Sequence, residues 1–227
     1  MYSRELDGET KTFGISGKLW NGVLVLFDRE SGSHWTQLDG RAIQGEELGR
    51  RLEHVPSVFT TFGAWVEAHP DTLVLEKTED EKERRESLYA PYLADPEALR
   101  LPHIAEALAE SGLPVKTVVF GVRLAGDALA VPESVLERDT VVNTSVGGRA
   151  VALLRDSLTG GVIGRIREVE GATLELLPVR GHRATERVRT ADGGRTFLVD
   201  ELEALRVDRA YWYAWVRTVG TSRVLGE

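Results

Sequence analysis

The sequence contains no cysteine and no long apolar stretch, and each absence excludes a class of protein. Without Cys in its 227 residues, the chain cannot form disulfide bonds, offer a thiolate nucleophile or ligate zinc and iron–sulfur centres through sulfur. No run of about 18 apolar residues is present, so we expect no membrane span. The first residues also lack the apolar core of a signal peptide. As written, the sequence predicts a cytoplasmic protein, and a missing N-terminal segment would allow an extracytoplasmic one.

Basic residues are also fewer than acidic residues. The 36 acidic residues outnumber the 28 basic ones, which gives a net charge of −8. Nucleic-acid binding depends mostly on cationic contacts to phosphate, so no nucleic-acid partner is expected. Most of the basic residues are arginines, but they are scattered along the chain. A GC-rich genome explains that bias more simply than a dedicated site for phosphate or carboxylate.

Turn residues are frequent and point to a β protein. Asn21-Gly22 lies between two short apolar runs, and both residues tolerate the positive φ that a tight hairpin needs. Comparable turn pairs recur at Asp39-Gly40, Gly147-Gly148 and Glu170-Gly171. With 42% hydrophobic residues, the chain can bury a real core. We predict a mainly β fold, at the margin of α+β, built from hairpins and meanders in a sandwich-like or barrel-like form.

Few helices are expected. Residues 61–68 place Phe62 and Trp65 on one side, and Pro70 ends the pattern. Residues 208–219 carry a denser aromatic set, which is typical of a helix packed on a sheet, and end before Gly220. A further helix is predicted from Asp95 to residue 111. The mixed charges of residues 76–86 favour a solvated linker.

Weak matches between the two ends of the chain predict an internal duplication. The series Arg4-x-x-Asp7-Gly8 returns as Arg167-x-x-Glu170-Gly171, and the helix around Trp65 returns around Trp215. We therefore divide the chain into a first β-rich unit at 1–77 that is incomplete at its N-terminus, a charged linker and helix at 78–112, and a second β-rich unit at 113–227. Each unit is expected to bury its tryptophan against its own sheet. The second unit is expected to have lost the hairpin at 28–37 and to keep a remnant at 180–189.

The stretches 13–21 and 28–37 read Phe-Gly-Ile-Ser-Gly-Lys-Leu-Trp-Asn and Asp-Arg-Glu-Ser-Gly-Ser-His-Trp-Thr-Gln. They resemble a prokaryotic family of unknown function, DUF3179, whose pattern is Phe-Gly-Val-Ser-Gly-x-Leu-Tyr-Asn followed by Asp-Arg-x-Thr-Gly-Ser-x-Trp-Ser-Gln. The resemblance implies no activity. Family members often carry a Tyr-Cys-Pro-Leu-Cys stretch ahead of the Arg-x-x-Asp-Gly turn, and in this chain that stretch would lie before Met1. We expect Met1 to be an internal start or a boundary within a longer protein, with genuine loss as the alternative.

The second of these stretches is the candidate ligand site. In a strand, Ser33, Trp35 and Gln37 share one face, and Trp with Gln could stack on and hydrogen-bond a planar or sugar-like small molecule. The candidate ligand-binding residues are Asp28, Arg29, Ser33, Trp35 and Gln37. The alternative is structural: Asp28 satisfies the turn backbone and Trp35 fills the core.

Patterns of known catalytic chemistry are missing from the sequence. It has no Gly-x-Ser-x-Gly elbow, no His-Glu-x-x-His and no phosphate-binding loop, and its five histidines are dispersed. Acidic pairs such as Glu46-Glu47 are expected at the surface. We therefore assign no catalytic residue, no metal and no cofactor, and we favour a protein that is not an enzyme.

Three functions stay open. The first, and the one we favour, is a non-catalytic ligand-binding or scaffold module. The second is an enzyme whose reactive, Cys-containing segment lies upstream of this chain. The third is a structural or interaction protein, either a homo-oligomer or one whose first unit is completed by a partner chain.

Overall fold

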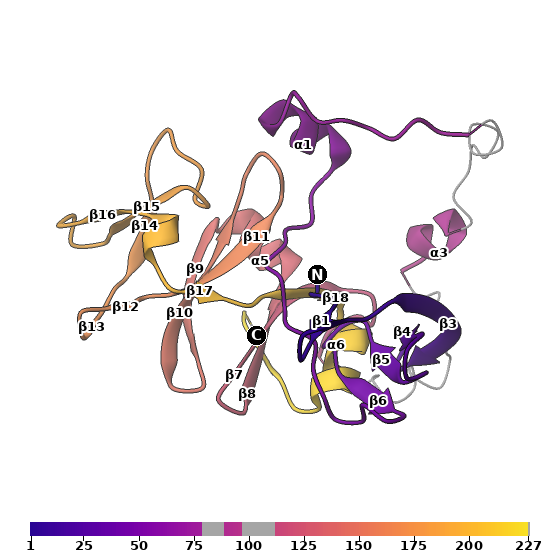
Figure 1. Ribbon diagram of the computed structural model, residues 1–227. Helices are drawn as coiled ribbons and strands as arrows, with labels where there is room; N and C mark the ends of the chain where they lie inside the picture. Colours follow the sequence, from indigo (N-terminus) through magenta and orange to yellow (C-terminus); the bar gives the residue numbers. More distant parts are fainter. Residues whose placement is uncertain (79–88, 97–111, 227) are drawn as a thin grey trace.

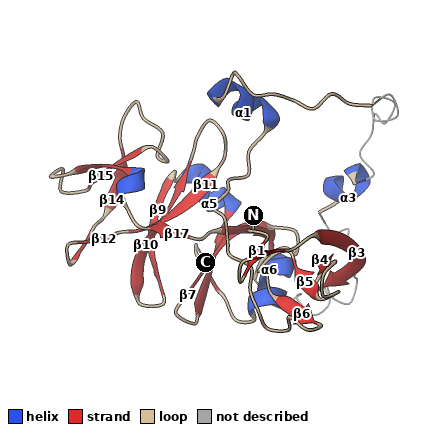
Figure 2. Cartoon of the chain, in the orientation of Figure 1, coloured by secondary structure: helices blue, strands red, loops and turns tan. Residues whose placement is uncertain are grey.

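The computed structural model describes residues 1–78, 89–96 and 112–226, and most of this chain forms short, mainly antiparallel sheets (Figure 1). Figure 2 shows a small number of short helices between the strands. The predicted mainly β fold is confirmed. The sheets are separate and open, so the described strands form no closed barrel.

The N-terminal β region, residues 1–54, is a hairpin followed by a four-stranded sheet. The hairpin pairs β1 (Glu5–Leu6) with β2 (Glu9–Thr10). The sheet has the order β3-β4-β5-β6 and consists of β3 (Phe13–Trp20), β4 (Val23–Asp28), β5 (His34–Thr36) and β6 (Ala42–Gln44). Between β3 and β4, Asn21 and Gly22 have φ angles of 53° and 78°, as the predicted hairpin turn requires. The core of this region consists of Leu6, Trp35, Ala42 and Leu52.

The C-terminal β region, residues 113–226, is built on two larger sheets. The first has the order β18-β7-β8-β19 and consists of β7 (Val118–Leu124), β8 (Asp127–Pro132), β18 (Asp208–Tyr211) and β19 (Arg223–Val224), with β19 parallel to β8. The second has the order β17-β11-β10-β9 and consists of β9 (Val141–Val146), β10 (Arg149–Arg155), β11 (Val162–Ile166) and β17 (Ala204–Leu205). Helix α5 (Glu133–Arg138) joins them and buries Val135 and Leu136 in the shared core.

Smaller elements extend this region. They are the hairpin β12 (Glu168–Val169) and β13 (Ala172–Thr173), the sheet β14 (Leu176–Pro178), β15 (Arg187–Thr190) and β16 (Thr196–Leu198), and the 3-10 helix η1 (Val199–Glu201). The sequence predicted that this region lost the 28–37 hairpin and kept a remnant at 180–189, and the structure has a hairpin of β14 and β15 around those residues, with Leu176 opposite Thr190. In this hairpin β14 follows β13 directly, whereas β3 stands between β2 and β4 in the N-terminal β region. The loss itself stays a prediction, because it depends on the duplication.

The predicted helices are partly confirmed. Helix α1 (Phe62–Ala68) lies where residues 61–68 predicted it, with Thr61 as its N-cap. Helix α6 (Trp212–Val219) is shorter than predicted, because residues 208–211 pair with β7 as strand β18. Helix α3 (Ala90–Ala94) was not predicted. The helix predicted from Asp95 and most of the charged run at 76–86 lie outside the described residues.

The two tryptophans of the predicted duplication differ in burial. Trp215 is 0% exposed, as expected, whereas Trp65 is 40% exposed. Figure 1 shows the ribbon of α1 apart from the sheets, and α1 contains no buried residue. The prediction that both indoles are buried on a sheet is therefore wrong for Trp65. The duplication and the unit boundaries stay predictions.

The N-terminal β region lies against the C-terminal β region through a polar and aromatic interface. Asn21 Nδ2 donates to the backbone oxygen of Arg217 over 2.8 Å, at the end of α6. Gly22 lies so close to the ring of Tyr213 that a Cβ there would be 2.4 Å from it. The Arg206 guanidinium donates to Tyr2 Oη over 2.7 Å and to Leu38 O over 2.9 Å. These contacts bring residues 1–54 next to α6 and to Arg206, which lies between β17 and β18.

Candidate functional site

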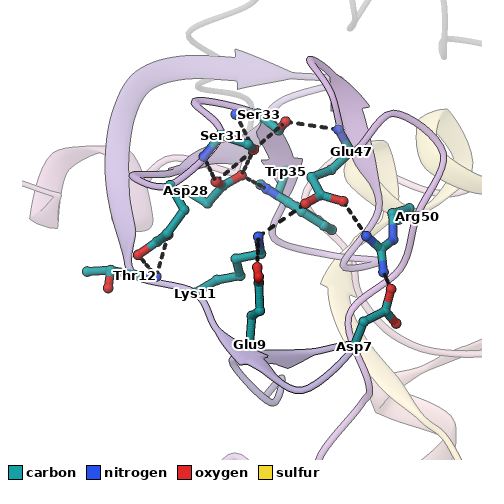
Figure 3. Close-up of polar contacts among 11 residues, drawn as sticks. Asp7, Glu9, Lys11, Thr12, Asp28, Ser31, Ser33, Trp35, Glu47 and Arg50 are labelled. Atoms are coloured by element: carbon teal, nitrogen blue, oxygen red, sulfur yellow. Dashed lines mark hydrogen bonds and ion pairs between the residues drawn. The ribbon is translucent and has the colours of Figure 1, made fainter.

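The candidate hairpin closes around the indole of Trp35, which is 0% exposed (Figure 3). Trp35 Nε1 donates to Asp28 Oδ2 over 2.8 Å. Asp28 also accepts hydrogen bonds from Ser31 N at 2.6 Å and from Ser31 Oγ at 2.8 Å. The Asp28 carboxylate is itself 0% exposed, so its oxygens serve the turn and the indole and do not face a ligand.

Ser33 links this hairpin to the loop after β6. Ser33 Oγ accepts from Ser31 Oγ over 2.7 Å and from the backbone N–H of Glu47 over 3.1 Å. The loop can approach this closely because Gly45 has φ of 98° and carries no Cβ, which would lie 2.5 Å from Ser33 Oγ. The buried Ser33 hydroxyl therefore fixes the loop to the hairpin.

A buried ion pair lies beside Trp35. Lys11 is 5% exposed and Glu47 is 7% exposed, and their Nζ and Oε1 atoms are 3.2 Å apart. Lys11 Nζ is also 3.2 Å from Glu9 Oε2, and Glu47 Oε2 accepts from Arg50 over 2.6 Å. The expectation that Glu47 is a surface charge is wrong. Sequence patterns gave no signal for this pair, because a single Lys and a single Glu far apart in the chain form no motif.

Local contacts keep these groups charged. Burial would raise the pKa of Asp28, but the hydrogen bonds from Trp35 and Ser31 outweigh it and hold the pKa below its ordinary value. The hydrogen bonds to Glu9 and Glu47 raise the pKa of Lys11. A permanently charged, fully paired lysine is neither a nucleophile nor a proton carrier at neutral pH. The network can hold the hairpin together, and its geometry offers no reactive group.

The structure brings three of the five candidate residues together and separates the other two. Asp28, Ser33 and Trp35 belong to the closed network. Arg29 is exposed, with its guanidinium 5.6 Å from the ring of Phe27. Gln37 is also exposed, and it lines a cleft. The single polar floor that the sequence suggested is therefore not formed, and ligand binding by these residues stays a prediction.

The cleft beside Gln37 runs under residues 54–58, where the two β regions meet. It consists of a cavity of about 450 Å³ and a second of about 540 Å³. Both are lined by His54, Ser57, Val58, Val162 and Val207. The shared lining makes them two parts of one cleft that the 54–58 segment divides. Sequence analysis missed it, because its walls come from segments far apart in the chain.

The walls of the cleft are mostly apolar, and polar side chains line both cavities. The rings of Tyr2 and His54 meet edge to face at 5.8 Å between centroids. Burial, together with the nearby charge of Arg206, lowers the pKa of His54. Because an ordinary His titrates near 6.5, this imidazole is neutral at pH 7. Asp208 is 2.8 Å from Arg206 and 2.9 Å from Arg123, so its charge is balanced.

The segment that divides the cleft is tied to the N-terminus. Val55 N donates to Met1 O over 3.0 Å, and the Met1 amino group donates to Ser57 Oγ over 2.9 Å. Just after the segment, Thr60 Oγ1 donates to Thr159 O over 2.9 Å. The guanidinium of Arg209 lies 4.4 Å from the centre of the Phe59 ring, which is 67% exposed. Val58 is 48% exposed although it lines both cavities.

Other site types find no support in the described residues. Residues 1–78, 89–96 and 112–226 contain no group of three or more His, Asp or Glu side chains arranged to hold a metal ion. Within the same residues, no helix is long and apolar enough to cross a membrane.

A family model described as a protein of unknown function, DUF3179, matches residues 1–221, which is nearly the whole chain. No curated protein and no solved structure matches.

Proposed function

Since the chain belongs to DUF3179, a family of proteins of unknown function, we propose its role from geometry alone: a non-catalytic module that binds a small, largely apolar molecule in the cleft under residues 54–58. The observation that carries this proposal is the pair of cavities with shared walls. Each has a volume within the range of about 300–1,000 Å³ that is usual for small-molecule sites.

The lining sets the chemistry of the ligand. Val58, Val162 and Val207 supply apolar surface to both cavities. Polar side chains interrupt this surface in both cavities: Gln37 and Asp208 line the first, Arg165 and Arg206 line the second, and His54 lines both. A ligand with an apolar body and a few polar groups that meet these side chains would fit this distribution, because a polar group placed along the valine walls would lose its hydrogen bonds to water.

The charges near the cleft favour binding over catalysis. Asp208 is already paired with Arg206 and Arg123, and neither partner is free to donate a proton. The charged groups around Trp35 are likewise paired with one another and closed off from solvent. General acid–base chemistry would fall to His54, which lines both cavities and is neutral at pH 7, and we assign it no acid–base partner among the paired charges of Asp208, Arg206 and Arg123.

The experiment is a titration of the full chain with the apolar fluorescent probe 1-anilinonaphthalene-8-sulfonate. Val58→Trp narrows both cavities at the side chain that they share and is expected to weaken probe binding at least about tenfold, or about 1.4 kcal/mol. Gln37→Ala is expected to leave the fold intact and to weaken binding, because it removes a polar contact at the cleft end. Unfolding curves establish that each variant is folded.

Leu73→Ser is the matched control, because Leu73 is 96% exposed and lies outside the cleft. Its probe affinity should equal that of the parent chain. If Leu73→Ser weakens binding and Val58→Trp does not, the probe binds exposed apolar residues and the cleft is not the site.

A further inference from the structure

The arm, which we define as residues 61–75, presents a row of uncovered apolar side chains. It consists of α1 and the extended segment after it. The exposed fractions are 62% for Phe62, 40% for Trp65, 96% for Leu73, 66% for Val74 and 94% for Leu75. Helix α1 contains no buried residue. Contiguous apolar surface of this kind marks an interaction site, since a helix this short gains little stability by itself.

The arm has the internal geometry of a segment that is docked elsewhere in the chain. Trp65 Nε1 donates to Thr72 Oγ1 over 2.9 Å, and Trp215 Nε1 donates to Ser222 Oγ over 2.9 Å. In each case the donor tryptophan lies in a short helix, and the acceptor hydroxyl belongs to the residue seven positions later. The arm therefore shares with residues 212–225 a short helix whose tryptophan is hydrogen-bonded to a hydroxyl in the tail that follows.

The docked segment shows what this shape binds. The indole of Trp215 lies flat over Gly121 of β7, where a Cβ would be 2.3 Å from the ring. After Ser222, the chain adds β19 to the edge of β8, with Val224 opposite Ala130. Leu225 N then donates to Ala130 O over 2.9 Å. The seat is an antiparallel hairpin with a glycine under the indole and an open edge for a short parallel strand.

We propose that the arm docks on such a β-hairpin presented by a different protein chain, with Trp65 over a glycine and Val74 and Leu75 added to the edge strand. Addition of a strand to an open sheet edge is a common mode of recognition. The seat on β7 and β8 of this chain is already filled by α6 and β19. The partner must therefore offer a hairpin of the same kind with its seat empty.

A second copy of this chain is the less favoured occupant. Its seat would open only if α6 left it, which would expose Trp212 and Trp215, now 2% and 0% exposed. The arm would replace them poorly, since Phe62-Gly63 stands where α6 has Trp212-Tyr213. The exchange would expose Trp212 and Trp215 and bury Phe62 and Trp65 in their place, so it would gain less buried aromatic surface than it loses.

The test measures binding of the full chain to a fluorescein-labelled cyclic peptide of residues 116–132, which contain β7 and β8. Circular dichroism first establishes that the peptide forms strands. Val74→Asp in the full chain is expected to weaken binding at least about tenfold, or about 1.4 kcal/mol. A peptide carrying Gly121→Val should lose binding to a similar extent, because its side chain occupies the place of the indole.

The matched control is Ile15→Asp, because Ile15 is 71% exposed on β3, outside the arm. This variant should bind the peptide as the parent does. The proposal is overturned if a strand-forming peptide does not bind, if Val74→Asp or the Gly121→Val peptide binds as well as its parent, or if the chain is a dimer by light scattering that Val74→Asp dissociates. The last result would assign the arm to a second copy.

Discussion

Helices α1 and α6 have the same local design and opposite surroundings. Each is a short helix whose tryptophan donates to a hydroxyl seven residues later. Yet Trp215 is completely buried over Gly121, and Trp65 remains 40% exposed on a helix that contains no buried residue. The comparison shows that the arm can form its helix and the hydrogen bond of its indole without a β-hairpin beneath the tryptophan. Burial is decided by a distant hairpin, which the described chain provides for α6 only.

The largest effect is expected from truncating the two indoles. Trp215→Ala should lower the free energy of unfolding by about 3–5 kcal/mol, because it empties a packed site. Trp65→Ala should lower it by less than about 1 kcal/mol, as is usual for exposed positions. Denaturant unfolding of both variants measures the difference. Equal losses would mean that Trp65 is buried in solution and that the comparison fails.

The next largest difference is expected when Gly121, which lies against Trp215, and Gly63, which lies in α1, are each replaced by alanine. Gly121→Ala is expected to destabilise the protein by about 1–3 kcal/mol, because its Cβ would overlap the Trp215 ring. Gly63→Ala should not destabilise it, since no atom lies within 4 Å and alanine favours the helix. Thermal and denaturant melts of the pair check this. A stable Gly121→Ala variant would show that the seat is loosely packed.

A smaller difference is expected at the hydroxyls that accept the indole hydrogen bonds. Ser222→Ala leaves the buried Trp215 N–H without its acceptor and should lower the free energy of unfolding by about 1–2 kcal/mol. Thr72→Ala should have no measurable effect, because water can replace the hydroxyl at the exposed Trp65. The measurement is the midpoint of denaturant unfolding, compared between variants whose unfolding free energy depends on denaturant concentration with the same slope. A clear loss in Thr72→Ala would indicate that the arm is ordered by more than its own contacts.

Of the two helix-and-tail segments, acid should weaken only the docked one, and this is the smallest of the expected differences. Asp127 accepts hydrogen bonds from Gly147 N and from Arg223 of β19, and these lower its pKa. Its contribution is therefore complete above the unfolded value of about 3.9 and is lost as the pH falls through the lower folded value. Stability measured from pH 6 down to acid should fall less steeply in Arg223→Leu than in the parent. Identical profiles would exclude a role for this ion pair.

Much of the fold followed from local sequence. Positive φ at Asn21-Gly22 and at Glu170-Gly171 is a demand of the turn itself, so those hairpins were predictable from two residues each. The same is true of α1, whose Thr61 cap and apolar stripe lie within the helix. The end of β18 was not predictable in this way, because residues 208–211 become a strand only through pairing with β7.

The site could be predicted only in part. The hairpin residues Asp28 and Trp35 do meet, because a tight turn brings them together within one strand pair. The cleft needs residues 54–58 to lie beside β11, and nothing in either segment records the other. Sequence analysis predicted a buried Trp65 because the residues around it match those around Trp215. A matching helix sequence does not provide the distant hairpin that buries Trp215.

The buried contact between Lys11 and Glu47 has an evolutionary consequence. Loss of either residue alone would strand a charge in the core, whereas loss of both together can be nearly neutral if apolar residues fill the space. Descendants of this sequence should therefore tend to keep both residues or to replace both. Across relatives, the identities at positions 11 and 47 should change as a pair, although the two positions lie far apart in the sequence.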